Sequence, residues 1–521
     1  MRVLRRFFVL VFTVFMLTAV AGAAVRLPAV IGSNMVLQQG MELNIWGWAA
    51  PGEKVTVLLN QKEVSAETNK IGEWKVKLPA QEAGGPLTMR VSGENSLTLE
   101  NILIGEVWVC SGQSNMEKKI GPQSGQHPVT NWVHEIEAAD YPKVRLFHVP
   151  RATSGIPVSD VNASWMECSP NTIKEFSAVG YFFGRNIHKE TGYPVGLIMT
   201  AWGGTRSEPW TPPSGFAQVK ETAEISRTVK QANQDYQEDM ASYLEAESSW
   251  EKQVKESTVS GMSMPDIPLQ PAHALDSHQQ PTGLFNAMVA PLIPFNIRGA
   301  IWYQGEGNRD DRLGYESKMQ ALIKGWRTEW NQGDFSFYLV QLAPFNYENT
   351  DQVGFSYPEA YYLPEVWVAQ LKTLKVPNTG MAVTTDITEL YDIHPTNKQA
   401  VGKRLALWAL ANDYGRKDLV YSGPLYKGMK KDGSRILVSF DHTGSGLKSN
   451  DGEPLNWFEI AGSDGVFTKA EAVVEGDQVA VSSPAIANPA AVRFAWHELA
   501  VPNLVNREGL PASPFNSEML P

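Results

Sequence analysis

A serine follows an apolar, strand-like run near residue 110. The sequence there reads VWVCSGQSNM, so Ser114 stands two residues after Gly112. A serine in a glycine-containing loop at a strand end is placed to act as a nucleophile, although its hydroxyl needs a neighbouring base. The G-x-S-x-G nucleophile elbow is absent, because Met116 stands where the second glycine would be. For a lone serine of this kind an ordinary polar strand-to-helix turn is the better explanation, so the interpretation of Ser114 depends on the other strand ends.

Two further clusters follow two later apolar runs. Gly203 and Gly204 come after VGLIMTAW, and paired glycines let backbone N–H groups approach a ligand closely. Gln304, Glu306 and Asn308 come after RGAIWY, and an amide side chain can donate to a developing oxyanion. A plain turn and a hydrogen-bonded polar loop are the respective alternatives.

An aspartate and a histidine stand two residues apart, before a pattern that predicts a helix from about Thr396. Asp392 and His394 could form a base and the carboxylate that orients it, with Asp386 as a rival for the second role. A metal site would need more ligands than this pair, and no HExxH is present. We therefore expect no metal and no cofactor.

The middle of the chain alternates apolar runs with longer helical patterns. The runs at 106–111, 195–202, 298–304, 336–343 and 379–386 are almost wholly apolar, as parallel strands buried on both faces are. This alternation predicts a doubly wound parallel α/β domain over about 102–416. Because ligands bind beyond the carboxyl ends of such strands, the polar clusters should meet there.

The flanking regions are different in pattern. Short strand-like runs separated by turn residues predict a β-sandwich-like domain at 24–101 and a β-rich region at 417–521. The stretch at 217–258 is charged and has no glycine or proline, so it predicts one or two surface helices inserted in the α/β domain. A lid or a docking role is the alternative for this insertion.

The first 23 residues have the pattern of a signal peptide. Three arginines among the first six residues precede an apolar run at 7–20 and a small-x-small Ala-Gly-Ala at 21–23. The run is short for a membrane anchor, which is the rival interpretation. We therefore expect an exported protein, periplasmic or secreted, with no membrane contact after the signal is removed.

Composition narrows the possible partners. The 521 residues carry a net charge of −11, which argues against a general nucleic-acid binder. Only two cysteines are present, Cys110 and Cys168, so a disulfide scaffold and a multi-cysteine metal site are excluded. One disulfide or two buried thiols both fit, and nothing in the sequence predicts an oligomeric state.

The order of these clusters resembles that of the SGNH hydrolases: serine, glycine pair, amide and Asp-x-His, each after its own strand. The amino-acid sequence of several segments is similar to that of the sialate O-acetylesterase family. The matching segments are VWVCSGQSNM, GLIMTAWGGT, GLFNAMVAPLIPFNIRGAIWYQGEGN, FYLVQLAPF, DIHPTNKQAVGKRLAL and NLVNREGLPASPF. The resemblance extends from NMVLQ at 34–38 to LPASPF at 510–515.

The resemblance implies a serine esterase that removes O-acetyl groups from carbohydrates through an acetyl-enzyme intermediate. The substrate would be an acetylated sialic acid or a plant-type glycan such as xylan. By motif, Ser114 would be the nucleophile, His394 the general base and Asp392 its orienting partner. The backbone N–H groups of Ser114 and Gly204 and the side chain of Gln304 would form the oxyanion hole.

Two positions depart from the family pattern. Gly307 stands where the family often has serine, and Arg206 stands where a small residue or proline is usual. Arg206 could bind a substrate carboxylate, with a surface salt bridge as the alternative. The other candidates for substrate contacts lie beside the motifs: Gln113, Asn115, Glu306 and Asn308. Among the tryptophans, the candidates for stacking on a sugar are Trp202, Trp210 and Trp302.

Two other functions remain open. A non-catalytic carbohydrate-binding protein would also use β-rich flanking regions, but the intact set of Ser114, Gly204, Gln304 and His394 favours an enzyme. An esterase that acts on a different acyl group would keep the same catalytic residues.

Overall fold

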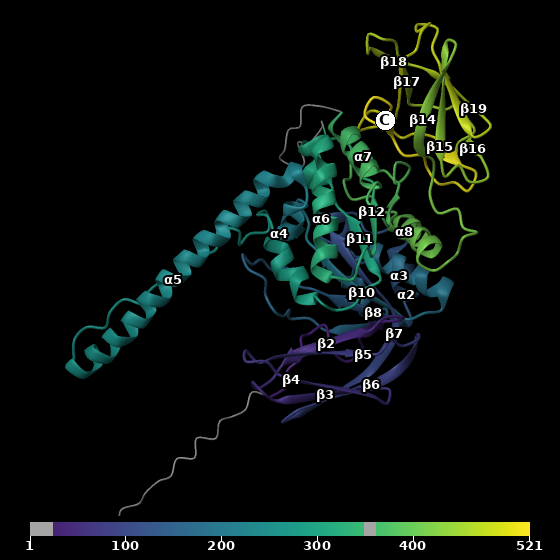
Figure 1. The fold of residues 1–521 in the computed structure, drawn as a ribbon. Coiled ribbons are helices and arrows are strands. Elements are labelled where there is room, and N and C mark those ends of the chain that lie inside the picture. Colours follow the sequence, from purple (N-terminus) through teal and green to yellow (C-terminus); the bar gives the residue numbers. More distant parts are fainter. Residues whose placement is uncertain (1–23, 348–360, 521) are drawn as a thin grey trace, which may run out of the picture.

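The computed structural model describes residues 24–347 and 361–520. The described chain forms a central α/β part between two β-rich regions, at the purple and the yellow end of the chain (Figure 1). The mixed α/β class with β-rich flanks is therefore as predicted. The expected signal peptide at 1–23 lies outside the described residues.

The central sheet has the order β13-β12-β11-β7-β10-β8-β9. Its strands are β7 (Ser96–Gly112), β8 (Tyr141–His148), β9 (Trp165–Cys168), β10 (Val195–Ala201), β11 (Gly299–Tyr303), β12 (Ser336–Val340) and β13 (Thr379–Ala382). All neighbours pair in parallel except β8 and β9. Gly112 is in register with Ala201 on one side and with Tyr303 on the other. Three adjacent strands therefore end at the same level of the sheet, and Ser114, Gly203 and Gln304 follow these ends.

The five expected strands are present, and the segments predicted for them are mainly buried because most of their residues are apolar. The sequence patterns miss β8 and β9, whose residues include charged side chains. Arg145 in β8 is buried all the same, because its guanidinium donates to the carbonyls of Asn34 and Asn101. Internal hydrogen bonds thus replace the water that a buried charge loses.

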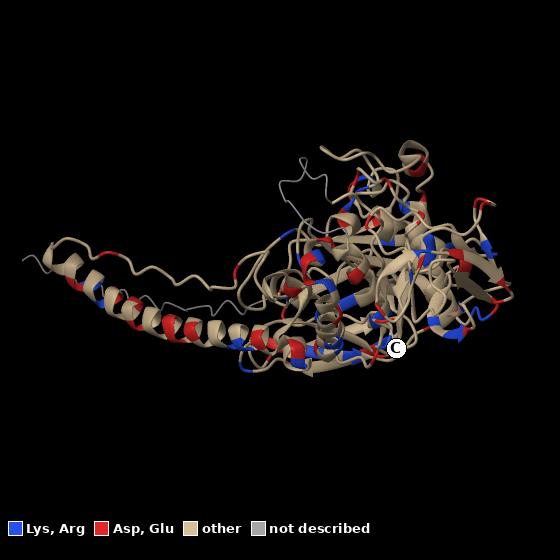
Figure 2. Ribbon diagram, turned by 90° about the horizontal axis from the view of Figure 1, so that it is seen from above, with Lys and Arg blue, Asp and Glu red and all other residues tan. Residues whose placement is uncertain are grey.

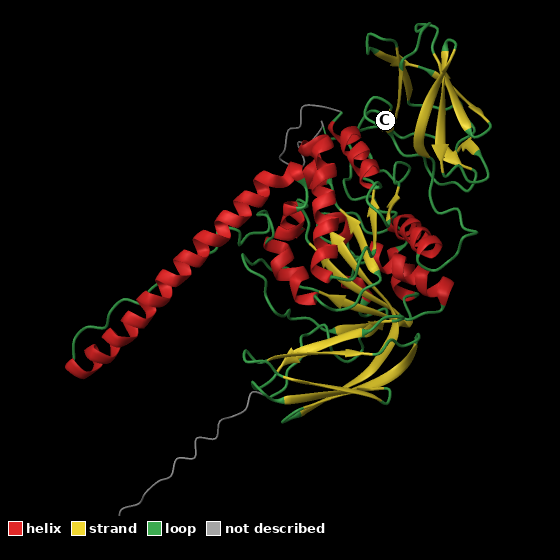
Figure 3. Cartoon of the chain, in the orientation of Figure 1, coloured by secondary structure: helices red, strands yellow, loops and turns green. Residues whose placement is uncertain are grey.

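Helices cover both faces of the sheet (Figure 3). Helices α3 (Ala178–Thr191) and α8 (Lys398–Asn412) pack against each other on one side. Helices α4 (Pro213–Ala217), α6 (Tyr315–Trp330) and α7 (Tyr362–Thr373) lie on the other. Helix α8 begins two residues later than predicted, where the Asn397 side chain accepts a hydrogen bond from the N–H of Ala400. A further short helix of this part is α2 (Trp132–Glu137).

The N-terminal β region is joined to the central sheet by a single long strand. Its strands are β1 (Val36–Gln38), β2 (Leu43–Trp48), β3 (Lys54–Leu59), β4 (Lys62–Glu67), β5 (Glu73–Leu78) and β6 (Gly84–Ser92). The first half of β7 pairs with β6 and the second half with β10 and β11. The pairing changes from β6 to β10 between Ile104 and Glu106, a few residues after Asn101, whose φ is 58°. The N-terminal region is thus fixed to the strand that ends before Ser114.

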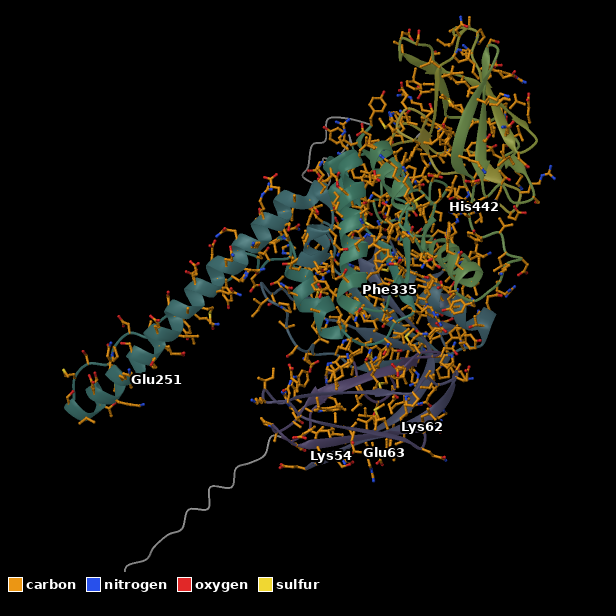
Figure 4. The ribbon with its side chains drawn as sticks, in the orientation of Figure 1. Lys54, Lys62, Glu63, Glu251, Phe335 and His442 are labelled. Atoms are coloured by element: carbon orange, nitrogen blue, oxygen red, sulfur yellow. The ribbon has the colours of Figure 1, made fainter. Side chains whose placement is uncertain are left out.

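A long arm projects from the central part. Helix α5 (Ala223–Ser260) has 38 residues, about 57 Å at 1.5 Å per residue, and extends away from the rest of the chain (Figure 2). Its described side chains are mostly exposed, and Glu251 lies toward its far end (Figure 4). The charged stretch at 217–258 therefore falls mainly on one helix. The chain returns along it, and the Trp250 indole donates to the Pro265 carbonyl at 3.1 Å.

The C-terminal β region contains two four-stranded sheets. One has the order β14-β15-β20-β19 and the other β18-β17-β21-β23, and β16 pairs with β22. The bounds are β14 (Leu425–Asp432), β15 (Arg435–Asp441), β16 (Leu447–Ser449), β17 (Phe458–Ala461), β18 (Phe467–Lys469), β19 (Glu471–Glu475), β20 (Gln478–Ser482), β21 (Ala491–Phe494), β22 (Leu504–Asn506) and β23 (Phe515–Asn516). A buried ion pair between Arg309 and Glu498, 3.2 Å long, ties this region to the central part.

Both cysteines are buried free thiols, so the structure decides against the disulfide alternative. Burial raises the pKa of the Cys168 thiol to about 12 and that of Cys110 further still. Because the thiolate is the reactive form, neither should react in the folded protein. We expect a thiol-specific reagent to titrate two thiols in denaturant and none within minutes in its absence. Rapid labelling of the folded protein would contradict this burial.

Candidate active site

Ser114 stands at the beginning of α1 (Ser114–Glu117), just beyond the end of β7. The N–H of Gln113 donates to the Tyr303 carbonyl at 3.0 Å, and that of Trp202 donates to Gly112 at 3.1 Å. These bonds hold the turn against the ends of β11 and β10. Ser114 is half-buried, and its hydroxyl and N–H bond to no other residue within 24–347 and 361–520. The hydroxyl is therefore uncommitted.

The glycine pair lies directly against this serine. A Cβ built on Gly203 would be 3.2 Å from the Ser114 Cβ and 3.2 Å from a Glu117 carboxylate oxygen. That carboxylate accepts the N–H of Gly203 at 2.8 Å and is itself held by Arg151. Gly204 has a φ of 76°, and its N–H donates to no residue in the described part of the chain. The loop thus supplies a fixed backbone with one N–H to spare.

His394 lies beside Asp392 rather than Asp386. The backbone N–H of His394 donates to Asp392 Oδ1 at 2.8 Å, and the ring nitrogen Nδ1 is 3.8 Å from the same oxygen. Asp386 instead forms a two-bond ion pair with Arg404, with both distances 2.6 Å. The second Asp392 oxygen is buried and makes no hydrogen bond among the described residues. The ring contact is longer than a hydrogen bond, and contacts of this kind often tighten when substrate binds.

The side chain of Asn115 links the three sequence motifs. Its amide nitrogen donates to Glu306 Oε1 at 2.6 Å and to the Ile393 carbonyl at 2.9 Å, and its oxygen accepts from Lys398 Nζ. Asn115 directly follows the serine, and Ile393 directly precedes the histidine. This buried carboxamide therefore brings the loop of Ser114 against the loop of His394.

Two lysines set the electrostatics of the histidine. Lys398 is buried without exposure at the start of α8, and its Nζ lies 5.1 Å from the centre of the Tyr303 ring. Burial, with the nearby charge of Lys118, lowers the pKa of Lys398 to about 7. Burial and then the charges of Lys398 and Lys118 lower the pKa of His394 to about 4, against the opposing effect of Asp392. His394 is thus neutral at pH 7 and able to accept a proton.

The side chain of Gln304, which was predicted to donate to an oxyanion, is engaged by other residues in this structure. Its Nε2 donates to the Thr205 carbonyl at 3.1 Å and to Asn308 Oδ1 at 2.7 Å, and its Oε1 accepts from the Tyr315 hydroxyl at 2.7 Å. A carbonyl can only accept, so the amide orientation is fixed. Both N–H groups are used, and the side chain is buried. Gln304 therefore braces the loops after β10 and β11.

The side chains of Arg206 and Asn308 also bind other residues of the protein. Arg206 makes ion pairs with Glu208, Asp310 and Asp311. Asn308 is buried and donates to Glu208 and Asp311. The salt-bridge alternative therefore describes Arg206, and the carboxyl groups that surround it leave little attraction for a substrate carboxylate.

The loops that carry Gln113 and Gly307 are in direct contact. The Gln113 side-chain oxygen accepts the N–H of Gly307 at 3.0 Å. A Cβ at position 307 would lie 2.8 Å from the Thr205 carbonyl oxygen, which is closer than such atoms approach. The glycine that departs from the family pattern is therefore required by the close approach of the two loops.

The tryptophans divide into two groups. Trp210 and Trp302 are buried and pack edge to face at 6.4 Å, so neither is available to a sugar. Trp202 is half-buried and stacks on His278, 5.0 Å away. The next residue, Gln279, donates to the Gly204 carbonyl at 3.1 Å. The segment that follows the arm therefore borders the site, and no motif in the sequence indicates it.

The described residues hold no group of three or more His, Cys, Asp and Glu side chains that could bind a metal ion. Among the same residues, no helix is both long enough and apolar enough to cross a membrane. Around Ser114 the structure places a neutral histidine with a carboxylate and backbone N–H groups that are unbonded among the described residues. Such a set performs acyl transfer.

The profile of one enzyme family matches this chain over 104–253 and 272–411, more than half of its length. The family is described as carbohydrate esterase, sialic acid-specific acetylesterase. The chain is thus a carbohydrate O-acetylesterase. More particularly, the chain belongs to the sialate O-acetylesterase family.

Individual relatives agree with this assignment. Sialate O-acetylesterase of Mus musculus is 30% identical over 455 residues, which cover 81% of this chain and 80% of the mouse protein. The Homo sapiens enzyme is 30% identical over 78% of this chain and 74% of its own. The crystal structure of a carbohydrate acetylesterase from Xanthomonas citri superposes with a TM-score of 0.78 and 33% identity, over 94% of this chain and 99% of that one.

The charge of Lys398 can be tested through the titration of His394. Replacing Lys398 by Met removes a positive charge that disfavours the imidazolium, so the pKa of His394 should rise from about 4 toward its usual 6.5. NMR would follow the ring proton, assigned by its loss in His394→Asn. Lys403→Met, an exposed lysine on the same helix, is the control. An unchanged midpoint in Lys398→Met would contradict the role of this lysine.

Proposed function

We propose that the chain is a serine esterase that removes acetyl groups from carbohydrate hydroxyls through an acetyl-enzyme intermediate. The observation that carries the proposal is the hydrogen bonding of Asn115, which joins the loop of an uncommitted serine to the loop of a neutral histidine. The family assignment supports the carbohydrate ester as substrate.

In the proposed mechanism the Ser114 oxygen attacks the acetyl carbonyl carbon while His394 Nε2 takes the hydroxyl proton. Asp392, beside Nδ1, stabilises the imidazolium that forms. The imidazolium then gives its proton to the leaving sugar oxygen. Water repeats the sequence on the acetyl-enzyme and releases acetate.

The negative charge of the tetrahedral intermediate needs donors that are already in place. The N–H groups of Ser114 and Gly204 are unengaged among the described residues and belong to adjacent loops. Preorganised donors of this kind are worth about 2.7–4 kcal/mol each in activation free energy. We assign the oxyanion hole to these two and give Gln304 the task of holding the loops.

We also infer that the central part is of the SGNH-hydrolase type. The support is the parallel strand order around β7 and the sequence of serine, glycine, amide and Asp-x-His loops at the carboxyl ends of the strands. For localisation, we propose export to the periplasm or secretion, because of the signal pattern at 1–23.

The sugar is proposed only as a class. The named relatives act on sialate or other acetylated carbohydrates, and the carboxylates around Arg206 argue against that residue as a reader of acidic sugars. A panel of acetylated sialic acid and acetylated xylan should rank the two. Release of other acyl groups at higher rates would support the alternative of a non-acetyl esterase, and binding without release would support a carbohydrate-binding protein.

Removal of the nucleophile tests the mechanism. Ser114→Ala and His394→Ala should each lower kcat by at least about 10³-fold, because the serine and its base act as a unit. Acetate release from acetylated xylan and from a small acetyl ester provides the measurement. Ser242→Ala, on the exposed arm, should behave as the parent. Near-normal turnover by a folded Ser114→Ala protein would refute the assignment.

The glycine beside the serine gives a second test. Gly203→Ala places a methyl group 3.2 Å from both the Ser114 Cβ and the Glu117 carboxylate, so the loop must shift and carry the N–H of Gly204 with it. We expect kcat to fall by at least about tenfold with little change in KM. Gly314→Ala is the control, because its Cβ would meet nothing within 4 Å. Unchanged kcat in Gly203→Ala would argue against the proposed oxyanion hole.

A further inference from the structure

The C-terminal β region contains a pocket that the chemistry of Ser114 does not use. Its volume is about 370 Å³, within the range of small-ligand sites. Aromatic rings and an ion pair account for most of its wall: Tyr361, Trp457, Trp496, His497, Glu459 and Arg493. The pocket lies where this region meets Tyr361, the residue of the central part that precedes α7.

The backbone presents two tryptophans at one end of a sheet. Trp457 precedes β17 with a φ of 61°, and Ala495 follows β21 with a φ of 54°. The two turns are joined by a hydrogen bond from the Ala495 N–H to the Trp457 carbonyl, 2.9 Å long. A left-handed conformation is costly for a residue as bulky as tryptophan and marks functional positions. Trp457 is 38% exposed, so burial of its ring does not explain the cost.

The polar groups of the pocket are fixed in place. Glu459 accepts from Arg493 Nε at 2.7 Å, and the guanidinium lies 4.3 Å from the centre of the Phe467 ring. His497 Nδ1 accepts the N–H of Leu499 at 3.1 Å, so the neutral ring carries its proton on Nε2. That proton has no acceptor among the described residues.

These features match a sugar ring. An indole face suits the C–H face of a pyranose, and fixed carboxylate, guanidinium and N–H groups suit its hydroxyls. Arg493 is neutralised by Glu459, and Lys469, which also lines the pocket, is exposed to solvent, so the pocket has no buried unpaired cation to select an acidic sugar. We propose that this pocket is a second carbohydrate site, which holds a neutral sugar unit of the glycan chain at a distance from the ester.

The pocket is mechanically connected to the serine loop. His497, in the pocket wall, is followed by Glu498, which forms the buried ion pair with Arg309. Arg309 lies two residues after Gly307, whose N–H binds the side chain of Gln113 next to the nucleophile. The ion pair thus joins the segment that forms one wall of the pocket to the segment that supports the catalytic turn. Such a connection fits two sites that bind the same polysaccharide chain. This inference rests on the proposed function only for its choice of carbohydrate as ligand.

Binding can be measured apart from catalysis. Isothermal titration of full-length Ser114→Ala with xylohexaose and cellohexaose should show saturable binding of at least one of them. Trp457→Ala in this background should weaken that binding at least tenfold, and so should the milder Glu459→Gln. Trp250→Ala, a half-buried tryptophan on the arm, should bind as the parent does. No binding of either hexaose, or equal binding after both pocket substitutions, would overturn the proposal.

Turnover distinguishes this site from the catalytic one. In the enzyme with Ser114 intact, Trp457→Ala should raise KM for acetylated polysaccharide at least fivefold and leave kcat on a small acetyl ester unchanged. If the proposed serine mechanism is wrong, the hexaose titrations still decide whether the pocket binds sugar. A Trp457→Ala protein that loses activity on the small ester to the same extent would show a structural role instead and contradict the proposal.

Discussion

The buried carboxamide of Asn115 is the interaction on which the site depends. Its two donors and its acceptor engage two segments that are far from it in sequence, one at Glu306 and one from Ile393 to Lys398, and both Glu306 and Lys398 are ionisable. Hydrogen bonds to charged groups contribute about 1.5–3 kcal/mol each, and a buried charge left without its partner costs more. The arrangement therefore fixes the serine and histidine loops together in one geometry. Burial, together with the charge of the same lysine, also lowers the pKa of His394.

The central sheet makes this arrangement possible because its parallel register brings three strand ends to one level. Beyond that level, each loop is held by side chains of another: Glu117 holds Gly203, Gln113 holds Gly307, and Gln304 holds Thr205. Polar residues near Ser114 are thus mostly structural in their contacts. The groups left for chemistry are few, namely one hydroxyl, one imidazole and backbone N–H groups.

The central strands and the polar residues at their ends were predictable from the sequence. Strands buried on both faces must be apolar, so β7, β10, β11, β12 and β13 are visible in the sequence, as are the polar residues at their ends. What the pattern could not show is which polar group pairs with which. Gln304 looks like an oxyanion donor until Thr205 and Tyr315 are found on either side of it. Likewise β8 is hidden because internal bonds compensate Arg145, and the exposed Trp457 depends on two left-handed residues that no local pattern predicts.

The central claim is that Ser114 carries the acyl group during turnover. The most direct measurement is mass spectrometry of peptides after the enzyme is mixed with an excess of acetyl ester and quenched rapidly in acid. The account predicts one acetyl group on the peptide that contains Ser114, present during turnover and lost when the ester is exhausted. Acetate release with Ser114 unmodified throughout, or with the acetyl group on another residue, would contradict it.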